Sequence, residues 1–205
     1  MTINIASSLK SKKLIVFDLD GTIVKLAADW YSLLKALNTR YSKKYKERGH
    51  FNSISGLLNE IVARGDEEEL QHNFNTIQQY EFENITKNEP IKEVIYFINN
   101  KELFGVNSAV RFAVFSLNTK ATIIKSLQLA RIAKEFEFFI GREDVRAWKP
   151  EPEGLLKIRD HFQMFSEDMI YFGDLKKDLL AGANAGVESY FISDLIKLVK
   201  KVRMN

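Results

Sequence analysis

The stretch Leu14-Ile-Val-Phe-Asp-Leu-Asp-Gly-Thr22 decides the fold of this chain. Four apolar residues are followed at once by two carboxylates and a glycine, the pattern of a short buried strand that ends in a polar loop. Similar apolar runs recur at residues 110–115, 136–140, 169–172 and 189–192. Between and after these runs lie segments with helical spacing, at residues 120–134, 153–162, 175–185 and 194–202. The alternation predicts a doubly wound α/β fold, in which a parallel sheet is covered by helices on both faces.

The segment 24–88 breaks this alternation, because it contains no run that is typical of a strand. Its apolar residues recur instead at helical spacing, namely Trp30, Leu33, Leu34, Leu37 and Tyr41, then Ile54, Leu57, Leu58 and Ile61. We therefore predict an all-helical domain inserted after the first strand, with Pro90 opening a helix that leads back to the sheet. The predicted domains are a sheet domain of residues 1–23 and 89–205 and a helical domain of residues 24–88.

The charges of the insertion are unevenly distributed. Residues 25–50 carry seven Lys or Arg against two Asp or Glu, whereas residues 51–90 carry two against eight. Solvated helix faces are the usual explanation of such blocks. The functional alternative is that the basic half, with residues such as Arg40 and Lys43, faces an anionic group of a substrate.

The composition excludes several kinds of chemistry. The chain has no cysteine and three scattered histidines, so disulfides, thiol nucleophiles, thiolate zinc sites and clustered-histidine metal sites are ruled out or disfavoured. With 30 Lys and Arg against 27 Asp and Glu, the net charge is too small to indicate nucleic-acid binding. No apolar run approaches the roughly 20 residues needed to span a bilayer, and none of signal-peptide length follows the first lysines. We expect a short flexible leader at residues 1–13 and a cytoplasmic protein.

Polar side chains follow the predicted strands at the points where the strands end. They are Asp18 and Asp20 after the first strand, Ser116 and Asn118 after the second, Lys149 after the third, and Asp174 with Asp178 after the fourth. Each has an ordinary structural explanation as a turn, a helix cap or a solvated lysine. However, ligands of open parallel sheets bind outside the carboxyl ends of the strands, so we expect these groups to lie together.

Such a group of side chains indicates chemistry on phosphate. Carboxylates that converge on one point repel each other unless a cation lies among them. Oxygen ligands without nitrogen or sulfur favour Mg²⁺. A lysine and a hydroxyl add the groups that hold a phosphoryl group, and two carboxylates two residues apart can divide nucleophilic attack and proton transfer between them.

Four ordered motifs carry a family resemblance: the stretch from Phe17 to Thr22, Ser116, Lys149-Pro-Glu-Pro152, and Gly173-Asp-Leu-Lys-Lys-Asp178. In order and spacing they resemble the motifs of the haloacid dehalogenase (HAD) superfamily, and the stretches that begin at Gly141 and Gly173 resemble its phosphoglycolate-phosphatase-like branch. The resemblance covers the sheet domain. The inserted helical domain is similar in place to the cap that closes over the site in such enzymes, excludes water and chooses the substrate.

The resemblance implies a role for each residue. Asp18 would be the nucleophile that forms an aspartyl-phosphate, and Asp20 the general acid/base. Mg²⁺ would be held by Asp18, the backbone carbonyl of Asp20, and Asp174. Ser116, Asn118 and Lys149 would bind the phosphoryl group, although Leu117 separates Ser116 from Asn118 where many relatives place the two residue types side by side. Asp178 and Thr22 would support the site from outside.

The function that follows is a Mg²⁺-dependent phosphatase that hydrolyses a small phosphomonoester. Sugar phosphomutases of the same superfamily are an alternative, but they carry a Thr and a His where this chain has Leu26 and Trp30. Phosphonate hydrolases use a lysine of the cap, for which Lys25 and Lys35 are candidates. A third alternative is a phospho-ligand-binding module that has lost catalysis.

The expected partner is a small phosphorylated metabolite, with no nucleic acid and no membrane, and the chain is expected to be a monomer or homodimer. A nucleic-acid interface on the basic residues 35–48 is the weaker interpretation. Tyr41 and Tyr45 interleave with those basic residues, but their helical spacing favours packing inside the helical domain.

Overall fold

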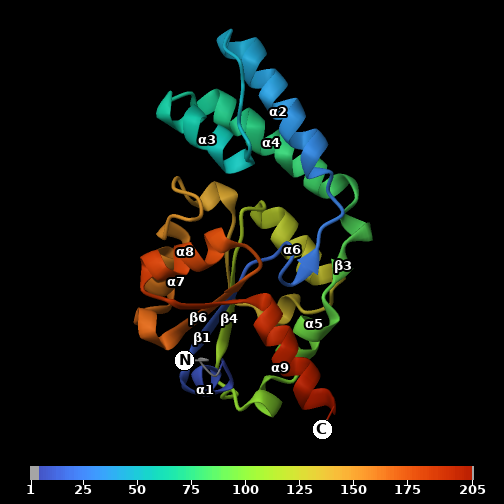
Figure 1. The fold of residues 1–205 in the computed structure, drawn as a ribbon, viewed down its shortest axis with the longest axis vertical. Helices are drawn as coiled ribbons and strands as arrows, with labels where there is room; N and C mark the ends of the chain where they lie inside the picture. The colour runs from blue at the N-terminus through green and yellow to red at the C-terminus, as the bar shows by residue number, and fades with distance from the viewer. Residues whose placement is uncertain (1–4, 205) are drawn as a thin grey trace. The chain divides into compact units, whose positions relative to one another are not determined.

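The computed structural model describes residues 5–204 and divides into two compact units. The first consists of the residues up to Leu26 together with those from Asn88 onward, and the second is Ala27–Lys87. The first unit contains the large sheet and the second is helical, so each is described by itself (Figure 1).

The large sheet has five strands, and every neighbouring pair is parallel. The strands are β1 (Leu14–Phe17), β4 (Arg111–Phe115), β5 (Phe138–Ile140), β6 (Met169–Gly173) and β7 (Glu188–Phe191). Their spatial order is β5-β4-β1-β6-β7, so the chain runs outward from β1 in one direction, returns, and then runs outward in the other. The predicted doubly wound α/β fold is confirmed, and β1 lies at the point where the strand order reverses.

Helices cover both faces of this sheet. Following the strands, they are α5 (Lys92–Asn99), α6 (Lys120–Leu129), α7 (Glu153–Phe162), α8 (Lys176–Ala185) and α9 (Ile192–Met204). The pair α7 and α8 lies on one face, and the pair α5 and α9 on the other (Figure 1). Every residue of β1 is buried as a result, which is why this strand is apolar without alternation. Within residues 5–204, no helix has both the length and the apolar character to cross a membrane.

The expected flexible leader is wrong for residues 5–11, which form the helix α1 (Ile5–Ser11). Leu9 is fully buried, and the Ser8 hydroxyl donates a 2.7 Å hydrogen bond to Glu188. Lys12 pairs with the same carboxylate at 2.8 Å. These contacts anchor the segment to the far edge strand of the sheet, a partner that local sequence does not indicate. Residues 1–4 of the expected leader lie outside the described part of the chain.

A separate two-stranded sheet, formed where the chain leaves the first unit and returns to it, changes two further expectations. The strand β2 (Val24–Lys25) pairs antiparallel with β3 (Glu89–Pro90), and α5 begins only at Lys92. Pro90 therefore ends a strand and does not open the helix. Because this pairing keeps residues 24–26 with the sheet, the helical unit begins at Ala27, three residues later than the segment 24–88 that the sequence suggested.

One predicted helix is too long. Residues 120–134 were expected to be helical throughout, but α6 ends at Leu129. Arg131 adopts a left-handed backbone conformation, with φ of 61°, and this interrupts the helix before a short 3₁₀ turn at Ala133–Glu135. The apolar period alone did not reveal this break.

The helical unit is built from α2 (Trp30–Tyr45), α3 (Ile54–Ala63) and α4 (Glu67–Glu83), and a 3₁₀ turn, Ile85–Lys87, follows α4. Each helix is preceded by a capping residue whose side chain accepts a hydrogen bond from a backbone N–H of the first turn. The capping residues are Asp29, Ser53 and Asp66, respectively. The apolar positions predicted from helical spacing form the core of this unit, among them Leu33, Leu37, Tyr41, Leu57, Leu58 and Ile61, which are all buried.

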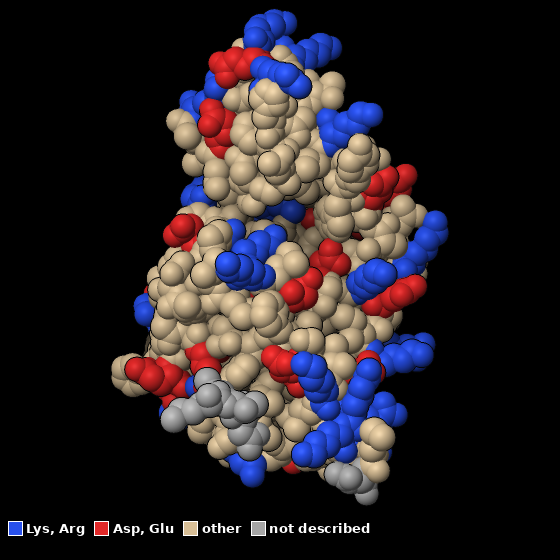
Figure 2. Space-filling view, viewed as in Figure 1, with Lys and Arg blue, Asp and Glu red and all other residues tan. Residues whose placement is uncertain are grey.

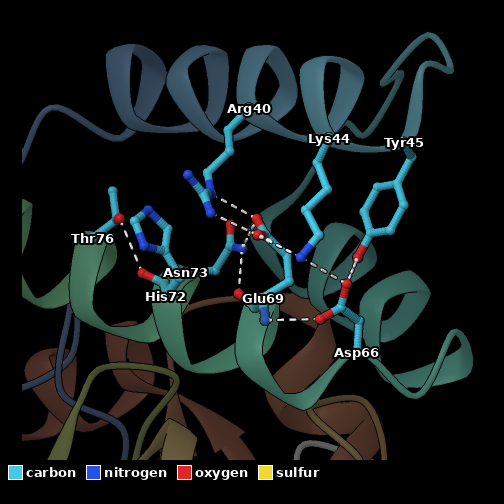
Figure 3. A network of polar contacts seen from close by, with 8 residues as sticks. All are labelled: Arg40, Lys44, Tyr45, Asp66, Glu69, His72, Asn73 and Thr76. Atoms are coloured by element: carbon cyan, nitrogen blue, oxygen red, sulfur yellow. Dashed lines mark hydrogen bonds and ion pairs between the residues drawn. The ribbon is translucent and has the colours of Figure 1, made fainter.

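A polar network joins α2 to α4 (Figure 3). Arg40 donates two hydrogen bonds of 2.7 Å to Glu69, whose side chain is only 1% exposed. Asn73 donates to the same carboxylate at 2.8 Å, and Lys44 pairs with Asp66 at 3.0 Å. The Tyr45 hydroxyl donates to Asp66 at 2.9 Å. The basic and acidic halves of the insertion therefore satisfy each other at this place, so Arg40 and Lys44 are not simply solvated.

Charge compensation extends over the surface of the helical unit. On its visible face, Lys and Arg side chains lie next to Asp and Glu side chains (Figure 2). Arg64, for example, pairs with Glu47 at 2.6 Å and with Glu60 at 2.8 Å. Burial disfavours the charged form of Glu69, but the hydrogen bonds from Arg40 and Asn73 outweigh it and lower the pKa of Glu69 below its ordinary value.

We expect Glu69→Gln to destabilise the helical unit, because the variant keeps the shape of the side chain and removes the charge that Arg40 and Lys44 share. The expected loss in the free energy of unfolding at pH 7 is about 1–3 kcal/mol. Since the folded pKa of Glu69 lies below its ordinary 4.5, this contribution is fully present above pH 4.5 and disappears as the pH falls through the folded pKa.

Urea denaturation followed by circular dichroism at several pH values measures this difference. The matched control is Glu68→Gln on the exposed neighbouring residue. Equal effects of the two substitutions at pH 7 would contradict a special role for the buried carboxylate.

Candidate active site

The carboxyl ends of the central strands bring the predicted residues to one edge of the sheet. Asp18 directly follows β1, and its backbone N–H donates to the carbonyl of Phe172 at 2.8 Å, which continues the pairing with β6. Since Phe17 is opposite Phe172, the register places Asp18 beside the end of β6, where Asp174 follows. Ser116 follows β4 on the other side of β1. Backbone pairing within the sheet therefore brings Asp18, Asp174 and Ser116 to the same edge.

Lys149, in the loop after β5, lies in this group, as its place after the third predicted strand suggested. Its ammonium donates to Oδ1 of Asp18 at 2.9 Å and to Oδ1 of Asp178 at 2.8 Å. It is 3% exposed and lies over the rings of Phe115 and Tyr171, at 4.6 and 5.3 Å from their centres. Burial disfavours its charge, but the two carboxylates outweigh burial and raise the pKa of Lys149 above its ordinary value. The site therefore holds a charged lysine away from water.

The loop that carries Lys149 is anchored on both sides. The indole N–H of Trp148 donates to the carbonyl of Arg142 at 3.0 Å, and Trp148 is buried. The carboxylate of Glu153, at the start of α7, accepts the backbone N–H groups of Arg146 and Ala147. These contacts fix the loop that delivers the lysine.

Asp178 is held by three donors. Its Oδ1 accepts from Lys149 and, at 2.9 Å, from the hydroxyl of Tyr171. Its Oδ2 accepts the backbone N–H of Leu175 at 3.0 Å. Burial disfavours its charge, but Lys149 and these hydrogen bonds lower the pKa of Asp178. Asp178 is therefore an anion, and it holds the Lys149 ammonium in place.

Asp18, Asp174 and Asp178 form a cluster in which one oxygen from each lies within 4.8 Å of the others. Burial and the negative charge of Asp178 raise the pKa of Asp18, although Lys149 opposes them. Burial, followed by the charges of Asp18, Asp178 and Asp20, raises the pKa of Asp174 to about 7. Lys149 alone does not offset three carboxylates, and burial lowers the pKa of Lys177, the second lysine whose charge acts on all three. The cluster therefore has the chemistry of a divalent-cation site.

One atom of this cluster is unsatisfied. Within the described part of the chain, Oδ1 of Asp174 is buried and has no hydrogen-bond partner. A buried polar atom without a partner is costly, and a cation ligand role explains it.

Asp20 and Gly21 lie in the tight loop after β1. Oδ1 of Asp20 accepts a hydrogen bond from the backbone N–H of Leu26 at 2.9 Å, which ties its carboxylate to the residue that follows β2. Gly21 has φ of 75°, and a Cβ there would lie 2.3 Å from Oδ2 of Asp174. Only glycine allows this loop to lie so close to Asp174. The carboxylate of Asp20 is not one of the three in the cluster, and the predicted use of its backbone carbonyl as a metal ligand stays a prediction.

Thr22 is fully buried in the same loop, and its backbone N–H donates to Leu19 at 3.2 Å. Its hydroxyl makes no hydrogen bond within residues 5–204. Its predicted supporting role stays a prediction.

Ser116 and Asn118 are both buried and bind each other. The Ser116 hydroxyl donates to Oδ1 of Asn118 at 2.9 Å, and the backbone N–H of Asn118 donates to the Ser116 oxygen at 3.3 Å. The intervening Leu117 does not separate them, because the chain turns sharply after β4. Asn118 thus orients the Ser116 hydroxyl.

Two residues of this site were not indicated by the sequence. Tyr171 lies in the apolar run 169–172, and Trp148 directly precedes Lys149 in a polar loop, so neither was singled out as a site residue. Their polar tips contact Asp178 and the Arg142 carbonyl, respectively. A tyrosine inside a fully buried strand is the one available signal, since its hydroxyl requires a partner.

Comparison with known proteins identifies a hydrolase family and a curated relative. The profile of a family described as haloacid dehalogenase-like hydrolase matches residues 15–192. The pyrophosphatase PpaX of Bacillus cereus (strain G9842) is 23% identical over 188 residues, which cover 89% of this chain and 84% of that protein.

Two solved structures share the fold. A Bacteroides fragilis protein described as a haloacid dehalogenase-like hydrolase superposes with a TM-score of 0.64 at 20% identity, covering 87% of this chain and 86% of that one. A Lactobacillus plantarum protein described as a phosphoglycolate phosphatase gives a TM-score of 0.62 at 12% identity, covering 95% and 92%. At these identities the likeness shows the fold.

The clustered carboxylates predict an unusual pH dependence. The raised pKa of Asp174, about 7 against an ordinary 3.8, means that its charged form destabilises the metal-free fold. We expect Asp174→Asn to raise the melting temperature of the metal-free protein at pH 8, by about 2–4 °C for each kcal/mol gained. The gain is largest above pH 7 and shrinks as the pH falls from 7 towards 3.8, because Asp174 itself becomes protonated.

Thermal melting in EDTA at pH 8, 6 and 4.5 measures the gain. Asp160→Asn, on a side chain that is 66% exposed, is the control and should show no such trend. A gain for Asp174→Asn that is the same at all three pH values would contradict the raised pKa.

Proposed function

This chain belongs to the haloacid dehalogenase-like hydrolase family, and on that premise we propose that it is a Mg²⁺-dependent phosphatase. In this proposal it hydrolyses a small phosphomonoester through an aspartyl-phosphate on Asp18, with Asp20 as general acid/base. The observation that carries the proposal is the buried contact between Lys149 and Asp18 beside the carboxylate cluster at the switch point of the sheet.

Asp18 is the proposed nucleophile. It attacks the phosphorus atom and forms an acyl phosphate while the bond from phosphorus to the leaving oxygen breaks. Its position supports this role, because it is buried, is fixed by the continuing β1–β6 pairing, and is held through Oδ1 by Lys149. A carboxylate with one oxygen fixed in this way is preorganised for in-line attack.

Asp20 is the proposed general acid/base. It gives its proton to the leaving oxygen in the first step and takes a proton from the attacking water in the second, so that it is restored after each turnover. The hydrogen bond from the Leu26 N–H to its Oδ1 orients the carboxylate in the loop next to Asp18. The antiparallel pairing of β2 with β3 fixes the two residues directly before Leu26, and in this proposal it thereby supports the orientation of Asp20.

Ser116, Asn118 and Lys149 are the proposed phosphoryl-binding groups. Lys149 supplies positive charge to the equatorial oxygens, and the Ser116 hydroxyl supplies a hydrogen bond. When no phosphoryl group is bound, the Asn118 side chain accepts the hydrogen bond of the Ser116 hydroxyl. In this proposal the hydroxyl turns from Asn118 to a phosphoryl oxygen when the substrate binds, and the buried Asn118 holds the serine oxygen in place.

The residues present fit Mg²⁺. The donors are oxygen atoms only, and the buried Oδ1 of Asp174 has no hydrogen-bond partner in the part of the chain that the structure describes. We infer that Asp18, the backbone carbonyl of Asp20, and Asp174 hold the ion, with Asp178 outside because Lys149, Tyr171 and Leu175 already occupy its oxygens. When bound, Mg²⁺ supplies positive charge that offsets the carboxylates and the phosphoryl oxygens.

The helical unit Ala27–Lys87 is the proposed cap, since it is inserted directly after the loop that carries Asp20. A cap excludes bulk water while the phosphoryl group is transferred to Asp18, and it selects the substrate. The PpaX relative is a pyrophosphatase by name and a structural relative is described as a phosphoglycolate phosphatase. A substrate panel should therefore contain pyrophosphate, phosphoglycolate, sugar phosphates and nucleoside monophosphates.

The mechanism predicts distinct losses on substitution. We expect Mg²⁺-dependent hydrolysis of p-nitrophenyl phosphate by the wild-type protein and none by Asp18→Asn. Asp20→Asn should lower kcat by about 10²- to 10⁴-fold, because acid/base catalysis is lost while the nucleophile remains. Asp160→Asn serves as the control and should keep full activity, since its side chain is exposed. Full activity of Asp18→Asn, or of the wild type in EDTA, would overturn the mechanism.

Metal binding can be measured without turnover. Saturating Mg²⁺ should raise the melting temperature of the wild-type protein at pH 8 by about 5–10 °C, because the ion binds only the folded state. Asp174→Asn should lose most of this shift, whereas Asp160→Asn should keep it. KCl at matched ionic strength is the salt control. An undiminished shift in Asp174→Asn would remove Asp174 from the ligand set.

A further inference from the structure

Tyr171 is a buried tyrosine that the mechanism above does not use. It lies in the middle of β6, the strand beside β1, and is completely buried. Its hydroxyl donates to Oδ1 of Asp178 at 2.9 Å and lies 3.4 Å from the carbonyl of Phe115. Phenylalanine would fill the same space without a polar atom, as Phe172 does at the next position. The hydroxyl therefore invites an explanation beyond packing.

The oxygen that accepts from Tyr171 also accepts from Lys149. Oδ1 of Asp178 lies 2.8 Å from the Lys149 ammonium, which in turn lies 2.9 Å from Oδ1 of Asp18. The four side chains thus form one continuous chain of hydrogen bonds, Tyr171 to Asp178 to Lys149 to Asp18. All four are buried, and in such surroundings each hydrogen bond strongly affects the next.

Asp178 and Asp18 compete for the same lysine. An Asp178 carboxylate with only Lys149 on Oδ1 would draw the ammonium towards itself and away from Asp18. The Tyr171 hydroxyl occupies part of the acceptor capacity of that oxygen and limits rotation of the carboxylate. Burial, and then the charge of Asp178, raise the pKa of Tyr171 well above its ordinary value, so the hydroxyl stays a donor.

We propose that Tyr171 is a positioning residue that, through Asp178, keeps the Lys149 ammonium in contact with Asp18. The inference rests on the proposed function, in which Asp18 is the nucleophile and Lys149 binds the phosphoryl group. Tyr171 does not touch the substrate. It sets how one buried positive charge is shared between two carboxylates.

The variant that tests this is Tyr171→Phe, which keeps the ring beneath Lys149 and removes the hydroxyl. With p-nitrophenyl phosphate and Mg²⁺, we expect kcat to fall about tenfold while KM stays within about twofold, because a hydrogen bond that matters in the transition state is weakened. The control is Tyr190→Phe on β7, whose hydroxyl donates to Glu188 away from the site. It should leave kcat and KM unchanged even if its melting temperature falls as much.

A crystal structure of Tyr171→Phe gives a second readout that needs no activity. The Lys149 ammonium, 2.9 Å from Asp18 in the wild type, should move beyond hydrogen-bonding distance while its contact with Asp178 remains. An unmoved ammonium, or a kcat within twofold of the wild type, would overturn the proposal. Absence of any phosphatase activity in the wild type would instead refute the proposed function, and the position of Lys149 would still decide the role of Tyr171.

Discussion

The site depends on one buried cation, the Lys149 ammonium between Asp18 and Asp178. A buried charge is very costly unless it is paired and hydrogen-bonded, so this contact requires that three distant parts of the chain meet accurately. The β1–β6 register brings Asp18 beside the end of β6, α8 begins there with Asp178 in its first turn, and the Trp148 anchor delivers the lysine. The pairing of Lys149 with both carboxylates therefore requires the correct fold of all three parts of the chain.

The cluster has more negative charge than Lys149 can offset. In a protein without cysteine and with scattered histidines, carboxylates are the groups best suited to metal binding and to nucleophilic attack, and the proposed mechanism assigns them both purposes. The fold keeps Asp174 in the cluster although burial and its neighbours raise its pKa to about 7, and Gly21 keeps the space beside it open. A site arranged in this way is poorly satisfied alone and well suited to a cation and a phosphoryl group.

In the helical unit, unlike in the carboxylate cluster, opposite charges are paired with each other. Its basic and acidic segments pair internally, with Glu69 buried beneath Arg40 and Asn73. These pairs connect α2 to α4, so Arg40 and Lys44, two of the basic residues that suggested an anion-binding surface, have a structural use. The nearly balanced composition of the whole chain conceals two opposite arrangements, a compensated network in one unit and an uncompensated cluster in the other.

The sequence by itself determined the five strands of the large sheet, the fold class and the predicted site residues at the strand ends. It could do so because strands buried on both faces are apolar throughout, and because parallel strands must end at one edge. Only the tertiary structure decided the strand order, the helix at residues 5–11, the hydrogen bond from Leu26 to Asp20, and the sharing of Lys149 between Asp18 and Asp178. Tyr171 shows the reason most clearly, because its role comes from a hydroxyl whose partner is set by how α8 packs on β6, and no local pattern of residues encodes that contact.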